Sequence, residues 1–180
     1  MSKITKCSFR KLCLQKLKSF NKTQRLKKNK TICNKILNII NINKPKNILL
    51  YIPLDIEVDV RPIINKLRKN NNINVFVPYI TGKLFKPVKY RLPLTKSKFN
   101  TKEPSFSLYK NNKINFDIIV VPIVGVDTLN KRVGFGAGMY DRFYETLNKK
   151  PIIIFTQITL CKTDEIITDE FDIKADYIIT

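Results

Sequence analysis

The residues with the clearest chemical capacity lie between positions 132 and 142, in the stretch "RVGFGAGMYDR". Three glycines at alternate positions leave the backbone bare, so its N–H groups can approach an anion closely. A carboxylate such as Asp141 suits Mg²⁺ in the company of phosphate oxygens, and Arg132 can hold a phosphate with two hydrogen bonds. The stretch therefore predicts a phosphate-binding loop that leads into a helix near Met139.

The two common phosphate motifs do not match this spelling. G-x-G-x-G is one residue shorter than the dinucleotide fingerprint, and no Gly-Lys-Ser/Thr follows as in a P-loop. The glycines alone would equally suit a tight strand–helix turn, and Asp141 alone would suit a helix N-terminus. A functional reading of the loop depends on the combination of the glycines with the tyrosine, aspartate and arginine.

Histidine is absent from the 180-residue chain, and this excludes Ser-His and Cys-His catalytic systems. Proton transfer must therefore use Asp, Glu, Lys, Tyr or the substrate itself. The four cysteines lie far apart without a C-x-x-C pair, which argues against zinc. We expect them to be reduced thiols in a cytoplasmic protein.

The formal net charge is +20, and lysine, asparagine and isoleucine are all in excess. An AT-rich coding sequence favours those residues, and we prefer this explanation to an anionic substrate or RNA. No apolar run approaches the roughly 18 residues of a membrane helix, and no signal peptide precedes the first predicted helix. We therefore expect neither a membrane nor a nucleic-acid partner.

Hydrophobic periodicity predicts the elements that must position these residues. Helices are expected at residues 3–19, 23–42, 60–70 and 139–150. Strands are expected at 47–52, 73–78, 116–124, 151–158 and 175–180. Residues 80–116 are expected to be irregular, with one candidate strand at 88–92.

Continuous Ile/Val strands separated by helices predict an α/β fold. We expect a three-layer α/β/α sandwich around a mostly parallel sheet, with room for antiparallel strands. It should form a single domain over residues 1–180, with a helical segment at about 1–43. Ligands bind beyond the carboxyl ends of such strands, which is where the 132–142 loop follows its strand.

The segment "VPIVGVDTLNKRVGFGAGMYDRF" (121–143) resembles the signature of the 5-formyltetrahydrofolate cyclo-ligase family, also called methenyltetrahydrofolate synthetase. Four further landmarks occur in the order that the family shows. They are "KCSFRK" (6–11), "LDIEVDVRPII" (54–64), "KEP" (102–104) and "FDIKADYIIT" (171–180). Their order and spacing make the resemblance more specific than the loop alone.

The resemblance implies an ATP- and Mg²⁺-dependent enzyme. Its reaction would convert 5-formyltetrahydrofolate to 5,10-methenyltetrahydrofolate through a phosphorylated formyl group, with release of ADP and phosphate. The partners implied are therefore a small-molecule folate and ATP, and we expect a monomer. Phosphoryl transfer depends on positioning and charge stabilisation, so a histidine nucleophile is not required.

The resemblance also assigns roles residue by residue. Tyr140 and Arg132 would be catalytic, Ile52 and Glu57 would bind the folate, and Asp141 and Asp172 would hold Mg²⁺. The residues assigned to ATP are Lys6, Arg10, Arg132, Gly134, Phe135, Gly136, Ala137, Gly138, Met139 and Tyr140.

Ordinary structural roles stay open for several of these residues. Lys6 and Arg10 would equally suit a solvated basic helix, Ile52 a core strand, and Glu57 the start of a helix. Asn130 stands where the family has glycine, and we expect it to tolerate a positive φ. Ala137 should cost little only if its φ is negative. Two alternative functions stay open: a basic nucleotide- or RNA-binding module, and a kinase with another acceptor.

Overall fold

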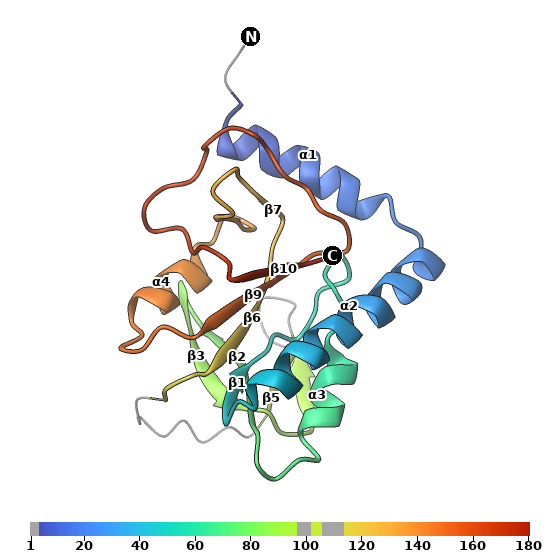
Figure 1. The fold of residues 1–180 in the computed structure, drawn as a ribbon, viewed down its shortest axis with the longest axis vertical. Helices are drawn as coiled ribbons and strands as arrows, with labels where there is room; N and C mark the ends of the chain where they lie inside the picture. Colours follow the sequence, from blue (N-terminus) through green and yellow to red (C-terminus); the bar gives the residue numbers. More distant parts are fainter. Residues whose placement is uncertain (1–3, 97–101, 106–113) are drawn as a thin grey trace.

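The computed structural model describes residues 4–96, 102–105 and 114–180, and its centre is a six-stranded sheet (Figure 1). The strand order is β10-β9-β6-β1-β2-β3, and all neighbours are parallel except β3, which runs antiparallel to β2. This mostly parallel arrangement confirms the α/β fold class. The strands are β1 (Asn47–Leu49), β2 (Asn74–Thr81), β3 (Leu84–Lys89), β6 (Ile118–Pro122), β9 (Ile152–Thr156) and β10 (Tyr177–Ile179).

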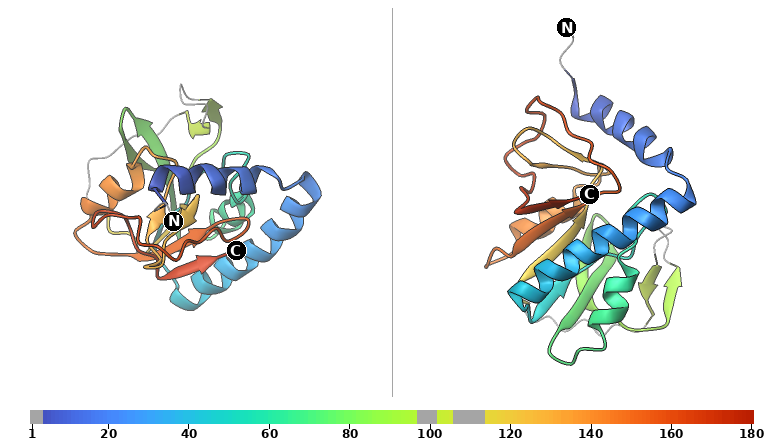
Figure 2. Two further views of the ribbon diagram at one scale, coloured as in Figure 1. Left: turned by 90° about the horizontal axis from the view of Figure 1, so that it is seen from above. Right: turned by 45° about the vertical axis from the view of Figure 1, so that its right-hand side comes forward.

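Helices cover both faces of the sheet because successive strand residues point to opposite faces. Ile48 joins a core cluster with α2 and α3, whereas the next residue, Leu49, joins a second cluster with α4. Figure 2 shows α2 and α3 together on one side of the sheet and α4 on the other. The helices in the described residues are α1 (Lys6–Lys18), α2 (Lys22–Asn43), α3 (Arg61–Leu67) and α4 (Met139–Glu145).

The two N-terminal helices begin at clear capping residues. Thr5 caps α1 and Asn21 caps α2, each in a reciprocal capping box with the residue three positions later. α1 then packs Phe9 against Val124 and Val133, in a small cluster above the carboxyl ends of the strands. This contact places the first turn of α1 beside the 132–142 loop.

Residues 80–116, which were expected to be irregular, include part of a hairpin that was not predicted from the sequence. β2 extends to Thr81, turns at Gly82 with φ +66°, and returns as β3. Of the candidate strand at 88–92, only the first two residues belong to β3. Two short strands follow, β4 (Leu94–Lys96) and β5 (Lys102–Pro104). Residues 97–101 and 106–113 of that region lie outside the described residues.

Cys13 of α1 and Cys161, in the loop after β9, form a disulfide with their Cα atoms 5.8 Å apart. The expectation of four reduced thiols is therefore wrong for this pair, while Cys7 and Cys33 are free. The two cysteines are 148 positions apart in the sequence. Only the packing of α1 on the loops brings them within the reach of a disulfide.

The chain changes direction across the sheet between β1 and β6. From β1 it passes through α3 to β2 on one side, and later returns to place β6 on the other side of β1. A crevice outside the carboxyl ends is expected where the strand order reverses in this way. The hairpin of β7 (Gly125–Val126) and β8 (Arg132–Val133) lies beyond β6 at this edge.

Of the helices in the described part of the chain, none combines the length and the hydropathy that a bilayer crossing requires.

Candidate active site

A largely apolar pocket opens at the point where β1 and β6 end. Its walls are hydrophobic apart from Glu57 and two tyrosines. The pocket therefore suits a flat, partly polar ring system. Its lining residues are Tyr51, Ile52, Leu54, Glu57, Pro78, Ile80, Phe85, Pro122, Met139 and Tyr140.

Glu57 is the one carboxylate among these lining residues. Its Oε2 accepts the N–H of Leu54 at 2.8 Å, in the turn that follows β1. Burial raises the pKa of Glu57 to about 7, although the Leu54 N–H and the charge of Arg132 act in the lowering direction. The side chain is thus an acceptor that gains or loses its proton near neutral pH.

Tyr140 closes the pocket from the start of α4. Its ring lies 5.0 Å from the ring of Phe85 and 5.2 Å from the guanidinium carbon of Arg132. Burial, followed by the charge of Glu57, raises the pKa of the Tyr140 phenol well above its usual range. Tyr140 is therefore a neutral hydroxyl that can donate a hydrogen bond into the pocket.

Residues 132–142, the glycine loop, turn on two positive φ angles, +105° at Gly136 and +60° at Gly138. Ala137 is not among the positive-φ residues, so the condition under which its side chain should cost little is met. Phe135, Gly136 and Ala137 are exposed, and Met139 faces the apolar pocket. Asn130, just before the loop, has φ +57°, which confirms the expectation that it tolerates a left-handed conformation.

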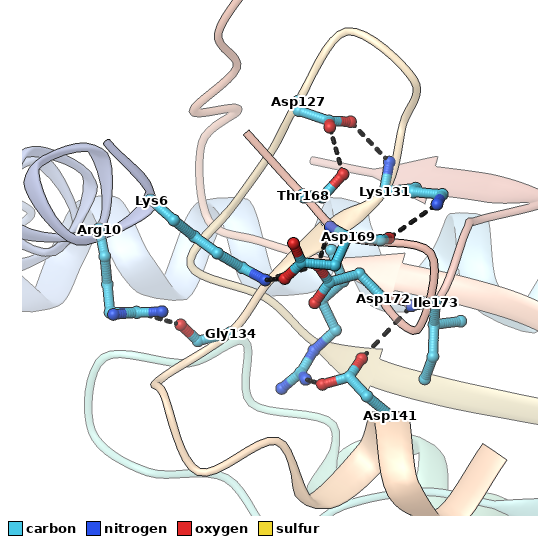
Figure 3. Close-up of polar contacts among 11 residues, drawn as sticks. Lys6, Arg10, Asp127, Lys131, Gly134, Asp141, Thr168, Asp169, Asp172 and Ile173 are labelled. Carbon is cyan, nitrogen blue, oxygen red and sulfur yellow. Dashed lines mark hydrogen bonds and ion pairs between the residues drawn. The ribbon is translucent and has the colours of Figure 1, made fainter. Parts of the chain in front are cut away.

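Two basic residues of α1 lie four positions apart on the same face of the helix, and one contacts the glycine loop while the other contacts Asp172. Arg10 Nε donates to the carbonyl of Gly134 at 2.7 Å, and its guanidinium lies beside Gly136. Lys6 Nζ lies 2.5 Å from Asp172 Oδ2 (Figure 3). Neither side chain is simply solvated, because each is committed to a group of the site.

Asp141 and Asp172 lie on the same side of the loop, each paired with a cation. Arg132 Nη1 donates to Asp141 Oδ2 at 2.9 Å, while Asp141 Oδ1 accepts the N–H of Ile173 at 3.3 Å. Within the described ranges, no group of three or more His, Cys, Asp or Glu side chains converges as a metal site. Two carboxylates instead fit an ion that also takes phosphate oxygens as ligands.

The position of Ile52 is compatible with both of the roles that the sequence left open. It lines the apolar pocket and also packs against the core cluster below α2 and α3. The structure thus brings Ile52, Glu57, Met139 and Tyr140 together around the pocket. The remaining assigned residues do not line the pocket. They are Lys6 and Arg10 of α1, the rest of the glycine loop with Asp141, and Asp172 on the segment between β9 and β10.

Six of the ten residues that line the pocket were not assigned from the sequence, and Tyr51 and Phe85 are two of them. Tyr51 is buried, and its hydroxyl lies 2.9 Å from both the Val58 carbonyl and Thr156 Oγ1. Its position directly after the apolar run "NILL" is the signal that could have indicated it, because that is the carboxyl end of a strand. Phe85 could not be found in this way, since it belongs to the unexpected strand β3.

Comparisons with known proteins point to one family. A sequence model of the 5-formyltetrahydrofolate cyclo-ligase family matches residues 2–180. A 5-formyltetrahydrofolate cyclo-ligase of Haemophilus influenzae is 30% identical over 123 residues, which are 65% of each chain. The enzyme of that name in Mycoplasma genitalium is 29% identical over 181 residues, or 98% of each chain.

Solved structures agree in fold. A 5,10-methenyltetrahydrofolate synthetase from Mycoplasma pneumoniae superposes with a TM-score of 0.75 at 22% identity, with 98% of each chain covered. The protein of that name from Aquifex aeolicus gives a TM-score of 0.79 at 24% identity, covering 98% of this chain and 90% of the other. Identities this low support the architecture rather than the role of any residue.

Proposed function

The chain belongs to the 5-formyltetrahydrofolate cyclo-ligase family, a family of ligases, and we propose that it converts 5-formyltetrahydrofolate to 5,10-methenyltetrahydrofolate with conversion of ATP to ADP and phosphate. The observation that supports this activity is that a region of charged side chains adjoins an apolar pocket. Cations from α1 and the glycine loop meet two aspartates directly beside an apolar pocket that holds one carboxylate. A polyphosphate and a pterin are chemically suited to these two environments.

The reaction needs ATP because a formamide oxygen is a poor leaving group. The formyl oxygen attacks the terminal phosphorus of ATP, and the bond to ADP breaks. The 10-nitrogen of the folate then forms a bond to the formyl carbon and gives up its proton. That new bond closes the five-membered ring, and the carbon–oxygen bond then breaks as phosphate leaves and the carbon–nitrogen double bond of the methenyl group forms.

The pocket residues would bind and orient the folate. Glu57, when ionised, can accept two N–H bonds from a pterin, while Ile52 and Met139 supply apolar contact with its rings. Tyr140 stands between the pocket and the glycine loop. Its neutral hydroxyl is suited to donate a hydrogen bond near the formyl oxygen.

The cationic residues would hold the phosphates and balance the charge that develops during transfer. Lys6, Arg10 and Arg132 are suited to this by charge and by position, since Arg132 belongs to the glycine loop, Arg10 contacts it and Lys6 contacts Asp172. Asp141 and Asp172 would hold Mg²⁺ jointly with phosphate oxygens. The metal ion would supply charge stabilisation on the transferred and leaving phosphate groups.

The proposal extends to the organisation of the protein. We infer a single domain over residues 1–180 that acts as a monomer, since residues of one chain supply all of the assigned groups. Neither an RNA partner nor a second acceptor is required to account for any part of this site.

A single assay tests the activity. The chain is incubated with Mg-ATP, with and without 5-formyltetrahydrofolate, and both ADP and the ultraviolet absorbance of the methenyl product are followed. Folate-dependent ADP release in step with that absorbance is the expected result. Folate-independent ADP release would point to another acceptor, and an absence of turnover with salt-sensitive RNA binding would point to a binding module.

Asp141→Asn tests the proposed role of this carboxylate in the same assay. Loss of the charge should reduce Mg²⁺-dependent turnover by about 100-fold or more, because charge stabilisation at the phosphates is lost. Asp164→Asn is the matched control, since Asp164 is an exposed carboxylate on the 158–173 loop. Unchanged activity in a folded Asp141→Asn protein would contradict the assignment.

A further inference from the structure

Lys6 forms an ion pair with Asp172, a carboxylate that the proposed Mg²⁺ site would need. Its ammonium lies 2.5 Å from Asp172 Oδ2 and 3.3 Å from Asp169 Oδ2 (Figure 3). Asp172 is the enclosed partner, with 11% of its side chain exposed against 73% for Asp169. The same Asp172 oxygen also accepts the N–H of Asp169 at 2.7 Å.

Asp141, the other proposed metal ligand, is also paired: Arg132 donates to one of its oxygens and the Ile173 N–H donates to the other. Three of the four carboxylate oxygens of Asp141 and Asp172 thus carry a donor from the described part of the chain. Mg²⁺ demands a near-ideal octahedron and gives up water reluctantly. Two cations beside these carboxylates would also repel a free divalent ion.

The two cations differ in their freedom to move. The Arg132 side chain is 6% exposed and lies between the backbone of Gly134 and the ring of Tyr140. Lys6 is 27% exposed and extends from the first turn of α1. Its ammonium is carried by a flexible four-carbon chain, so Lys6 is the cation that can leave its carboxylate.

We propose that Lys6 is a displaceable counter-ion of Asp172. While the ammonium is paired with Asp172, this carboxylate does not bind free divalent cations. When a polyphosphate attracts the ammonium, the carboxylate becomes available to a divalent cation. The inference rests on the proposed function, in which ATP is the polyphosphate. The ammonium stays paired throughout the exchange, with a carboxylate before it and with phosphate oxygens after it. The divalent cation therefore enters together with the polyphosphate and not before it.

The experiment measures the binding of Mn²⁺ alone, because carboxylate sites accept Mn²⁺ in place of Mg²⁺ and its paramagnetism reports the free ion. The wild-type chain, Lys6→Met and Lys11→Met are titrated without nucleotide. Lys11 is an exposed lysine on the same helix, so its replacement makes the same change in net charge. Lys6→Met should bind Mn²⁺ at least about tenfold more tightly than the wild type, and Lys11→Met should match the wild type.

Adding Asp172→Asn to Lys6→Met should remove the gain in affinity. The inference is overturned if Lys6→Met binds Mn²⁺ no more tightly than the wild type, or if Lys11→Met shows the same gain. Lys6→Gln repeats the measurement with a polar replacement, so that a folding defect of one variant does not decide the result.

A second measurement tests the displacement by polyphosphate. The affinity of the chain for ADP is determined with and without Mn²⁺, and the ratio of the two affinities measures the coupling between the sites. This ratio should be smaller in Lys6→Met than in the wild type, and equal ratios would overturn the inference. Association of Mn²⁺ with ADP in solution is the same for every variant, so the difference isolates Lys6. None of these readouts requires folate turnover, so a failure of the proposed reaction would be seen separately.

Discussion

Gly134 lacks a side chain at the place where the Arg132 guanidinium lies. A Cβ added to Gly134 would lie 2.5 Å from Arg132 Nη2 and 2.6 Å from its central carbon. Since Arg132 is buried and paired with Asp141, the added atom would push the guanidinium away from that carboxylate. The glycine is thus needed for the position of an arginine and not for an unusual φ.

Gly134→Ala should lower kcat at least about tenfold with little change in melting temperature, because it moves a positioned charge. Asn148→Ala is the control, since Asn148 is an exposed residue that belongs neither to the pocket nor to the glycine loop. Equal activity in the two variants would contradict this role of Gly134.

Glu57 predicts a pH dependence of folate use. In the free enzyme its pKa is raised to about 7 by burial, and a carboxylate accepts pterin N–H groups only when it is ionised. The value of kcat/KM for 5-formyltetrahydrofolate should therefore rise with pH up to about 7 and then level. Glu57→Gln should show a lower value without this acidic limb, and a limb that persists in the variant would exclude Glu57 as its cause.

The same pKa has a consequence for stability. The folded pKa of Glu57 lies above its ordinary value of 4.5, so the protonated form is favoured by folding. The stabilisation of the folded chain by protonated Glu57 is complete below about pH 4.5 and is lost as the pH rises to about 7. The ionised form that would bind the pterin is thus the less stable one in the unliganded chain.

Residue types and spacing predicted much of the site. The grouping of the glycine loop with Asp141, and of Lys6 with Arg10, follows from short sequence distances and helical periodicity. The ion pairs do not follow, because Lys6 and Asp172 are 166 positions apart and meet only in the folded chain. The sequence therefore indicates which groups are present, whereas the fold determines which of them are neutralised.

At the scale of elements, the packing of α1 against the β7–β8 hairpin determines where Lys6 and Arg10 lie. A Cβ added to Gly125 of β7 would lie 2.7 Å from the ring of Phe9 and 3.0 Å from the backbone oxygen of Cys161. The helix therefore rests directly on the bare backbone of this hairpin. Any residue larger than glycine must therefore displace the Phe9 ring or the backbone at Cys161, and both belong to the contact between α1 and the loops.

Gly125→Ala should weaken the binding of ADP several-fold and lower the free energy of unfolding by about 1–3 kcal/mol, as an overpacked contact does. Calorimetric binding and urea unfolding measure the two effects. Adding Phe9→Leu should restore part of both, because it removes ring atoms from the crowded contact. A double variant no better than Gly125→Ala would show that the ring of Phe9 is not what the alanine meets.

The strands that the sequence predicted well are the continuous apolar ones, such as β6, all of whose residues are buried. β3 was missed because it lies at the sheet edge, where "LFKPVK" alternates exposed and buried residues and contains a proline. Its hairpin supplies Pro78, Ile80 and Phe85 to the pocket. The unpredicted element thus builds one wall of the site.

At the scale of the whole molecule, one covalent bond joins the first helix to the loop after β9. Cross-linking residues 148 positions apart restricts the unfolded chain strongly, by roughly 5 kcal/mol in the loop-entropy model. Composition gave no indication of this bond, since a high positive charge and scattered cysteines suit a reduced protein equally well.

Cys13→Ser should lower the free energy of unfolding by about 2–5 kcal/mol and make it insensitive to dithiothreitol. Cys7→Ser is the control, because Cys7 is a free and exposed cysteine on the same helix. Urea unfolding with and without reductant checks both variants. A wild-type chain that unfolds identically under the two conditions would contradict a stabilising disulfide.

The bond between Cys13 and Cys161 also makes most of the polypeptide a covalent ring. A protease that cuts once anywhere between these positions opens the ring without releasing a fragment, so the chain keeps its full mass until a thiol is added. The last 19 residues, which carry Asp172 and strand β10, would stay tethered to the helix that carries Lys6. Damage to the backbone and dissociation of the site are therefore separate events in this protein.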